Sequence, residues 1–178
     1  MSLLIILKGF ANYASHDNKL KWENSGEIRN GWIRPGGADA ELQKNDDKFE
    51  LTSRYGLNAF KKWYYSAELN FNTQIFRGYK YPKAENPEVL SAFLSPSTTY
   101  LKIGLDYKPS EKLSLFLSPL TMKNVYVRDT ALVDQTNFSI DKGRKAFWEP
   151  GLNADLSYKT KLTDDISYET KYKLSLIH

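Results

Sequence analysis

The chain contains no cysteine and only two histidines among its 178 residues, which removes several classes of site. Without cysteine there are neither disulfides nor thiolate metal ligands, a composition that fits the bacterial outer membrane or periplasm. His16 lies in an expected polar turn and His178 is terminal, so neither is well placed as the base that nucleophilic catalysis requires. We therefore expect no catalytic residues, no cofactor, no metal site and no enzyme activity.

Long hydrophobic runs are missing as well, since no segment supplies 18 consecutive apolar residues and a membrane-spanning helix is excluded. The opening residues MSLLIILKGF have neither a basic leader nor a cleavage site, so we expect any export signal to lie outside this chain. The 25 basic and 21 acidic residues are interspersed, which predicts no nucleic-acid partner. A mean hydropathy of −0.55 still permits a membrane barrel, where every second residue can be polar.

The most informative stretch present is WYYSAELNFNTQIFRGYKY, residues 63–81. From Tyr65 to Ile75 the odd positions are apolar or aromatic, apart from Thr73, and the even positions are polar. A period of two predicts a β-strand. The run is longer than a typical globular strand of about 5–6 residues and fits the roughly 9–11 residues that cross a bilayer at a tilt. We expect its odd positions to meet lipid and its even positions to meet water.

Seven further stretches alternate in the same way, and no convincing amphipathic helix is present. Short and long connections follow one another, which places all short turns at one end of a meander and all long loops at the other, as in outer-membrane barrels. The sequence therefore predicts an all-β, antiparallel up-and-down meander, an outer-membrane-type β-barrel or part of one. The eight expected strands cover residues 3–13, 20–29, 48–57, 65–75, 99–108, 113–118 (where Pro119 interrupts the pattern), 152–159 and 166–176.

The two chain ends fall on the long-loop side of this meander. Single-chain outer-membrane barrels are expected to begin and end on the short-turn side, so we expect further strands before Ser2 and after His178. A hydrogen-bonded seam between residues 3–12 and 166–176 would instead close the sheet. Residues 1–178 are thus expected to form a single β-barrel domain that is incomplete at both ends.

Several spaced elements then occur together along the middle of the chain. The elements are Lys44 with Asp46-Asp47, Tyr55-Gly56, Trp63-Tyr64-Tyr65, Thr73-Gln74, Gly78-Tyr79, Ser95-Pro96, Gly104-Leu105 and Ser118-Pro119-Leu120. In this combination the sequence resembles the domain-of-unknown-function family of predicted outer-membrane β-barrels found in Bacteroidota, over about residues 20–130. The resemblance implies an exported barrel, and it carries over no catalytic residue.

Residue roles follow from the alternation. Apolar positions of long strands are expected to face outer-membrane lipid, the expected partner, and aromatic residues near strand ends are expected at the membrane interface. The membrane-facing candidates are Tyr65, Leu69, Phe71, Ile75, Leu101, Ile103 and Leu105, and the interface aromatics are Trp22, Trp63, Phe76 and Tyr107.

Charged residues supply the remaining candidates. Asp46-Asp47 and Asp164-Asp165 could contribute to a hard-cation site, but they lack calcium-loop spacing and we interpret them as solvated turns. The inward charges could line a selective path for a solute of unknown identity, although mutually compensated pairs filling a narrow lumen are favoured. These charges are Lys48, Arg54, Glu68, Lys102, Asp106, Lys108, Asp155, Lys159, Glu169, Lys171 and Lys173.

Three function classes remain open at this point. The first is an outer-membrane barrel with a structural or transport role. The second is a soluble lipocalin-like barrel that binds a small apolar ligand, in which the apolar faces would point inward. The third is an outer-membrane enzyme, which the missing catalytic set disfavours. The direction in which the apolar faces point separates the first class from the second.

Overall fold

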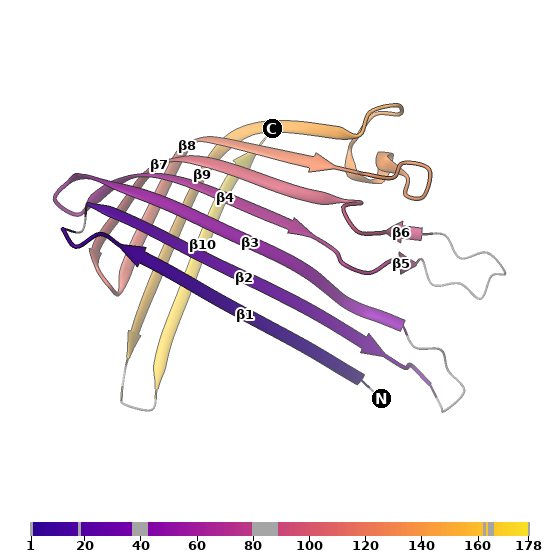
Figure 1. Cartoon of the computed structure of the whole chain (residues 1–178), viewed down its shortest axis with the longest axis horizontal. Helices are drawn as coiled ribbons and strands as arrows, with labels where there is room; N and C mark the ends of the chain where they lie inside the picture. Colours follow the sequence, from indigo (N-terminus) through magenta and orange to yellow (C-terminus); the bar gives the residue numbers. More distant parts are fainter. Residues whose placement is uncertain are drawn as a thin grey trace.

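The computed structural model describes residues 2–17, 19–36, 43–79, 89–161, 163 and 166–177. These residues form one eight-stranded antiparallel sheet in the order β1-β2-β3-β4-β7-β8-β9-β10, together with a two-stranded ribbon of β5 and β6 (Figure 1). The strands are β1 Ser2–Ala14, β2 Leu20–Ile33, β3 Gln43–Phe60, β4 Trp63–Thr73, β5 Gly78–Tyr79, β6 Val89–Ser91, β7 Ser97–Ser110, β8 Leu113–Tyr126, β9 Ala146–Lys161 and β10 Ser167–Ile177, and a 3-10 helix, η1, spans Gln135–Phe138.

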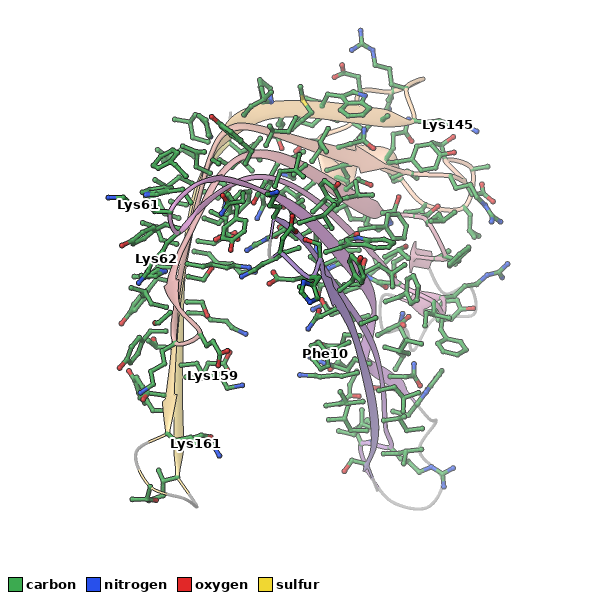
Figure 2. All side chains as sticks on the ribbon, turned by 60° about the vertical axis from the view of Figure 1, so that its left-hand side comes forward. Phe10, Lys61, Lys62, Lys145, Lys159 and Lys161 are labelled. Atoms are coloured by element: carbon green, nitrogen blue, oxygen red, sulfur yellow. The ribbon has the colours of Figure 1, made fainter. Side chains whose placement is uncertain are left out.

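The sheet curls into a half-barrel with a concave and a convex face. Figure 2 shows it as an arch whose legs carry the first and last strands. Within the described residues, β1 pairs with β2 and β10 pairs with β9, and no pairing joins β1 to β10. The predicted all-β antiparallel meander is confirmed, and the seam that would have closed the eight strands on themselves is absent from this part of the chain. Incompleteness at both ends stays a prediction.

Side-chain alternation gives each strand one row of residues per face. Glu68 of β4 lies opposite Arg54 of β3 and Lys102 of β7, so these three share a face. The next residue, Leu69, lies opposite Leu101 of β7 on the other face. Cross-strand rows therefore assign charged residues to the concave side and apolar residues to the convex side.

Short turns and long connections alternate as predicted. Short turns join β1 to β2, β3 to β4, β7 to β8 and β9 to β10, and they lie at the opposite end of the strands from the long connections (Figure 1). The long connections before β7 and before β9 pack together around buried Ala92, Val127, Val133 and Ile140. In the second of them, the hydroxyl and backbone N–H of Thr136 donate to the Asp134 carboxylate and hold its pKa below the usual range.

Pro119 does not interrupt strand β8, contrary to the sequence prediction. The register between β7 and β8 shifts there, so that Ile103 pairs with Leu120 and Leu105 pairs with Leu117. The Ser118 hydroxyl donates at this bulge, with the Ile103 carbonyl 3.1 Å away and the Leu120 carbonyl 3.0 Å away. A bulge leaves a residue outside the ladder, which is a position that proline tolerates because it has no N–H to donate.

The predicted strand from Tyr65 to Ile75 corresponds to β4, and its expected end at Ile75 is wrong because β4 ends at Thr73. The Thr73 hydroxyl accepts the N–H of Leu94 at 3.1 Å. The N–H groups of Ile75 and Phe76 donate to the Asp47 carboxylate at 3.1 and 2.8 Å. Side chains, instead of a neighbouring strand, thus satisfy the backbone at this end.

We predict that Gly104→Ala destabilises the fold by about 2–3 kcal/mol, the upper part of the range of about 1–3 kcal/mol that is typical of overpacking. A Cβ atom at Gly104 would lie 1.9 Å from the Leu117 carbonyl oxygen, so the backbone of the bulge would have to move. Urea unfolding in detergent micelles measures the change. Gly9→Ala is the matched control, because a Cβ there meets nothing within 4 Å; equal midpoints for the two variants would contradict the close approach.

Candidate functional site

The concave face encloses an open groove of about 1150 Å³. Both legs of the arch contribute to it, and so does the roof, which is the part of the sheet between the legs. Residues of β1, β2, β3, β4, β7, β8, β9 and β10 line it. Most of the residues that line it are polar or charged, and Arg54, Glu68, Lys102, Lys108 and Asp155 are among the charged ones. This groove is the candidate functional site.

A continuous series of ion pairs, which we call the ion chain, runs across the roof of the groove. Lys108 Nζ lies 2.6 Å from Glu23 Oε1 and 3.2 Å from Asp106 Oδ2. Asp106 Oδ2 also lies 3.5 Å from Arg54 Nη1, and Arg54 Nε donates to Glu68 Oε2 at 2.7 Å. Each charge in this half of the ion chain therefore has an opposite charge beside it.

Lys102 carries the chain onward from Glu68 to β9. Its Nζ lies 3.2 Å from Glu68 Oε1 and donates to Asp155 Oδ2 at 2.9 Å. Glu68 is 5% exposed, Lys102 8% and Asp106 2%, so these charges are removed from bulk water. Charges this buried need partners, because an unpaired one carries a large desolvation penalty. The buried charges of the ion chain are therefore mutually compensated.

Further contacts hold the network in place. The Ser114 hydroxyl donates to Asp106 Oδ1 at 3.0 Å, and the Arg54 guanidinium lies 4.5 Å from the centre of the Phe116 ring. Next to the ion chain, Asn70 Nδ2 donates to Glu50 Oε1 at 2.8 Å, and Glu50 forms an ion pair with Lys48. The inward residues that the sequence predicts are thus largely brought together as compensated pairs.

Lower on the β10 leg the inward charges are more exposed. Lys171 and Glu169 form an ion pair of 2.8 Å, with side chains 60% and 45% exposed. Figure 2 shows Lys159 on the inner side of the same leg. Glu23 belongs to the ion chain but is missing from the inward charges predicted from the sequence. It lies on the polar face of its strand, so the alternation of side chains alone could have identified it.

A second polar cluster lies at the long-loop end and corrects the interpretation of Asp46-Asp47 as a solvated turn. Asp47 lies within β3, and its side chain is only 2% exposed. Lys44 Nζ donates to Asp47 Oδ2 and to the Phe76 carbonyl, each at 2.8 Å, and to Gln74 Oε1 at 3.2 Å. The Asp47 oxygens also accept the N–H groups of Ile75 and Phe76, so Asp47 holds the segment after β4 against β3.

Gly78 and Ser91 complete this cluster. The Ser91 hydroxyl donates to Gln74 Oε1, and a Cβ at Gly78 would lie 2.5 Å from Ser91 Oγ. Elements that the family resemblance rests on, namely Lys44, Asp47, Gln74 and Gly78, are therefore neighbours in space. Their contacts hold β3 to the segments that follow β4, which gives these residues a structural role.

The structure describes only part of the remaining candidate ligands. His16 is exposed in the first short turn, and Asp164, Asp165 and His178 lie outside the described residues. Across the described ranges, no group of three or more histidine, aspartate or glutamate side chains is arranged to hold a metal ion. Nor does any helix in them have the length and apolar character needed to cross a membrane.

The membrane-facing candidates other than Ile75 lie on strands, on the convex face. Tyr65, Leu69, Leu101 and Ile103 are exposed there. Phe71, in edge contact with Phe49, and Leu105 are half-buried, and Ile75 is half-buried beyond the end of β4.

The interface aromatics divide between the two ends of the sheet. Trp22, Trp63 and Tyr107 lie at the short-turn end, where the rings of Trp63 and Tyr107 are 4.7 Å apart. Phe76 lies at the long-loop end, 5.9 Å from the ring of Trp32. Trp22 and Phe76 are exposed, and the other two are half-buried.

We predict that Glu68→Gln lowers the free energy of unfolding by about 3 kcal/mol, because it leaves Arg54 and Lys102 buried without this carboxylate. Glu169→Gln makes the same chemical change in an exposed pair on the same face, where a loss below about 0.5 kcal/mol is expected. Denaturant unfolding of both variants in micelles measures the difference. Equal losses would show that the roof of the groove is as well solvated as its leg.

Comparison with known proteins gives a partial match. Residues 1–79 match the sequence model of a family described as a protein of unknown function (DUF3078). Neither the curated proteins nor the solved structures contain a significant match to the chain. The matched region includes β1 to β5, and so it contains Lys44, Asp47, Gln74 and Gly78 of the polar cluster but ends before the Gly104 bulge. Over these 79 residues the chain is similar to the DUF3078 family.

Proposed function

We propose that this chain forms the wall of an outer-membrane-type β-barrel, with its convex face against lipid and its concave face lining an aqueous lumen. Its role is structural or in transport, and its location is the bacterial outer membrane. The observation that carries the proposal is the segregation of charge: in the middle of the strands the charged residues lie on the concave face and the convex face is apolar.

The convex face exposes many large apolar side chains over all eight strands. A monomeric soluble protein rarely exposes a contiguous apolar patch larger than a few hundred Å². Lipid contact accounts for a face of this extent. Its exposed members are Leu3, Ile5, Leu7, Tyr13, Trp22, Leu51, Tyr55, Leu57, Tyr65, Leu69, Leu101, Ile103, Leu117, Leu120, Trp148, Leu152, Leu156, Tyr158, Tyr168, Tyr172, Leu174 and Leu176.

Three side chains with polar atoms near the short-turn half of this face are linked by hydrogen bonds. Trp22 Nε1 donates to Ser53 Oγ at 2.9 Å, Ser53 Oγ donates to Asn24 Oδ1 at 2.8 Å, and Asn24 Nδ2 donates to the Ala11 carbonyl at 3.1 Å. In hydrocarbon an unsatisfied polar group costs several kcal/mol, so polar residues that face lipid must find internal partners. This relay supports lipid contact more directly than apolar composition does.

The height of the apolar band fits a bilayer. Trp148 and Tyr158 both point outward from β9, near its opposite ends, and are separated by ten residues. At about 3.3 Å per residue this is roughly 33 Å along the strand. At a tilt of about 40° it corresponds to about 25 Å across the membrane, the height of the apolar band between the aromatic girdles of outer-membrane barrels.

The soluble lipocalin-like alternative needs an apolar interior. In the described residues the roof of the groove instead carries the ion chain from Glu23 to Asp155. An apolar ligand would have to displace water from these charges without replacing their hydration. The proposal assigns no bond-making chemistry to the chain.

Single-cysteine labelling tests the orientation directly, because the chain has no cysteine of its own. Leu69→Cys reports the convex face, and Ser25→Cys, in the adjacent cross-strand row, reports the concave face at similar depth. With a bimane label in reconstituted vesicles, we expect doxyl lipids to quench the Leu69→Cys label strongly and aqueous iodide to quench the Ser25→Cys label. Iodide quenching at Leu69→Cys with no effect of doxyl lipid would contradict the proposal.

A further inference from the structure

Two buried polar atoms on the concave face of β9 have no partner among the described residues. They are Asn153 Nδ2 and Asp155 Oδ1. Asn153 is only 8% exposed, and both residues line the groove. Buried polar groups in folded proteins are almost always hydrogen-bonded, and each exception calls for an explanation.

The two atoms form a complementary pair. Asn153 and Asp155 are two residues apart on one strand, so their side chains emerge on the same face about 7 Å apart. The Asn153 amide nitrogen is a donor and the Asp155 oxygen is an acceptor. A ligand that bears both acceptor and donor groups, such as neighbouring hydroxyls, satisfies both. Leaving such groups unpaired while buried is unfavourable, which favours occupancy.

The charge around this pair favours a neutral ligand. Asp155 already binds Lys102 through Oδ2, and Lys173 of β10 lies opposite Asp155 in the register. The ion chain sets the four carboxylates of Glu23, Asp106, Glu68 and Asp155 against Lys108, Arg54 and Lys102, and Lys173 supplies the fourth positive charge. A strongly charged ligand would bring a desolvation cost and find no surplus of opposite charge to offset it.

An exposed aromatic ring lies in the same groove. Phe10 of β1 is 74% exposed, and Figure 2 shows it on the inner side of its leg. Tyr100 of β7 also lines the groove. An aromatic face carries partial negative charge and attracts the polarised C–H groups of a sugar ring, so Phe10 offers an apolar platform within a polar site.

We propose that the groove binds a neutral, polyhydroxylated solute of the sugar class. Its hydroxyl groups bond to Asn153 and Asp155, and a ring packs against Phe10. The volume of about 1150 Å³ accommodates a short oligosaccharide. This inference deepens the proposed function, since it names the solute class for which a lumen-facing groove is built.

Maltotriose binding to the refolded full chain tests the site. The micelles are made of lauryldimethylamine oxide, because sugar-headed detergents would compete. Saturation-transfer NMR is expected to show contact between the protein and maltotriose, and titration gives the dissociation constant. Asn153→Ala is expected to weaken binding about tenfold, as the loss of one hydrogen bond of about 1.4 kcal/mol would. Asn124→Ala is the control, since that amide donates to the Phe147 carbonyl.

Phe10→Ala provides a second variant that does not depend on core packing, because Phe10 is largely exposed on an edge strand. Its binding is expected to weaken several-fold, whereas Phe60→Ala, which removes an exposed ring outside the groove, leaves binding unchanged. Circular dichroism confirms that each variant is folded.

If the wild-type chain shows no saturation transfer to maltotriose, the site is overturned, and water is then the partner of Asn153 and Asp155. Binding that Asn153→Ala and Phe10→Ala do not weaken would overturn it as well. Bimane quenching of Leu69→Cys in reconstituted vesicles, measured alongside the binding experiment, keeps the two proposals separate. Lipid quenching without sugar binding removes the site alone, and sugar binding without lipid quenching removes the membrane wall alone.

Discussion

The ion chain on the roof of the half-barrel is the interaction on which the rest of the structure depends. Arg54, Glu68, Lys102 and Asp106 come from three neighbouring strands and are held within hydrogen-bond or ion-pair distance of one another. A one-residue slip of any one of these strands would send its members of the ion chain to the opposite face and leave their partners unpaired. The chain therefore fixes the register of β3, β4 and β7, and that register fixes which face is apolar.

Segregation of the faces also accounts for what the groove is able to hold. The charges on its roof are paired with one another, so they do not create a strong field for a charged solute. On β9, Asn153 Nδ2 and Asp155 Oδ1 are without a partner among the described residues, and the ring of Phe10 is exposed in the same groove. Hydrogen bonding to a neutral ligand is the chemistry that these groups offer.

Alternation along the strands could be predicted from the sequence, and Leu69 and Asn70 illustrate why: a period of two is a local property that needs no partner. Local signals also predicted the short turns. The end of β4 at Thr73 could not be predicted, since it depends on Asp47, 26 residues earlier in the chain. The bulge opposite Gly104 likewise requires Ser118 and Pro119 of another strand, and the partners of each inward charge depend on cross-strand register.

The central claim is that the convex face meets lipid and the concave face meets water, and methyl NMR in lipid nanodiscs tests it most directly. With leucine and threonine methyl groups labelled, the account predicts Overhauser contacts from lipid acyl chains to Leu69, Leu101 and Leu152. It predicts contacts from water to Thr52 and Thr98. Acyl-chain contacts to Thr52 and Thr98, with none to the three leucines, would contradict it.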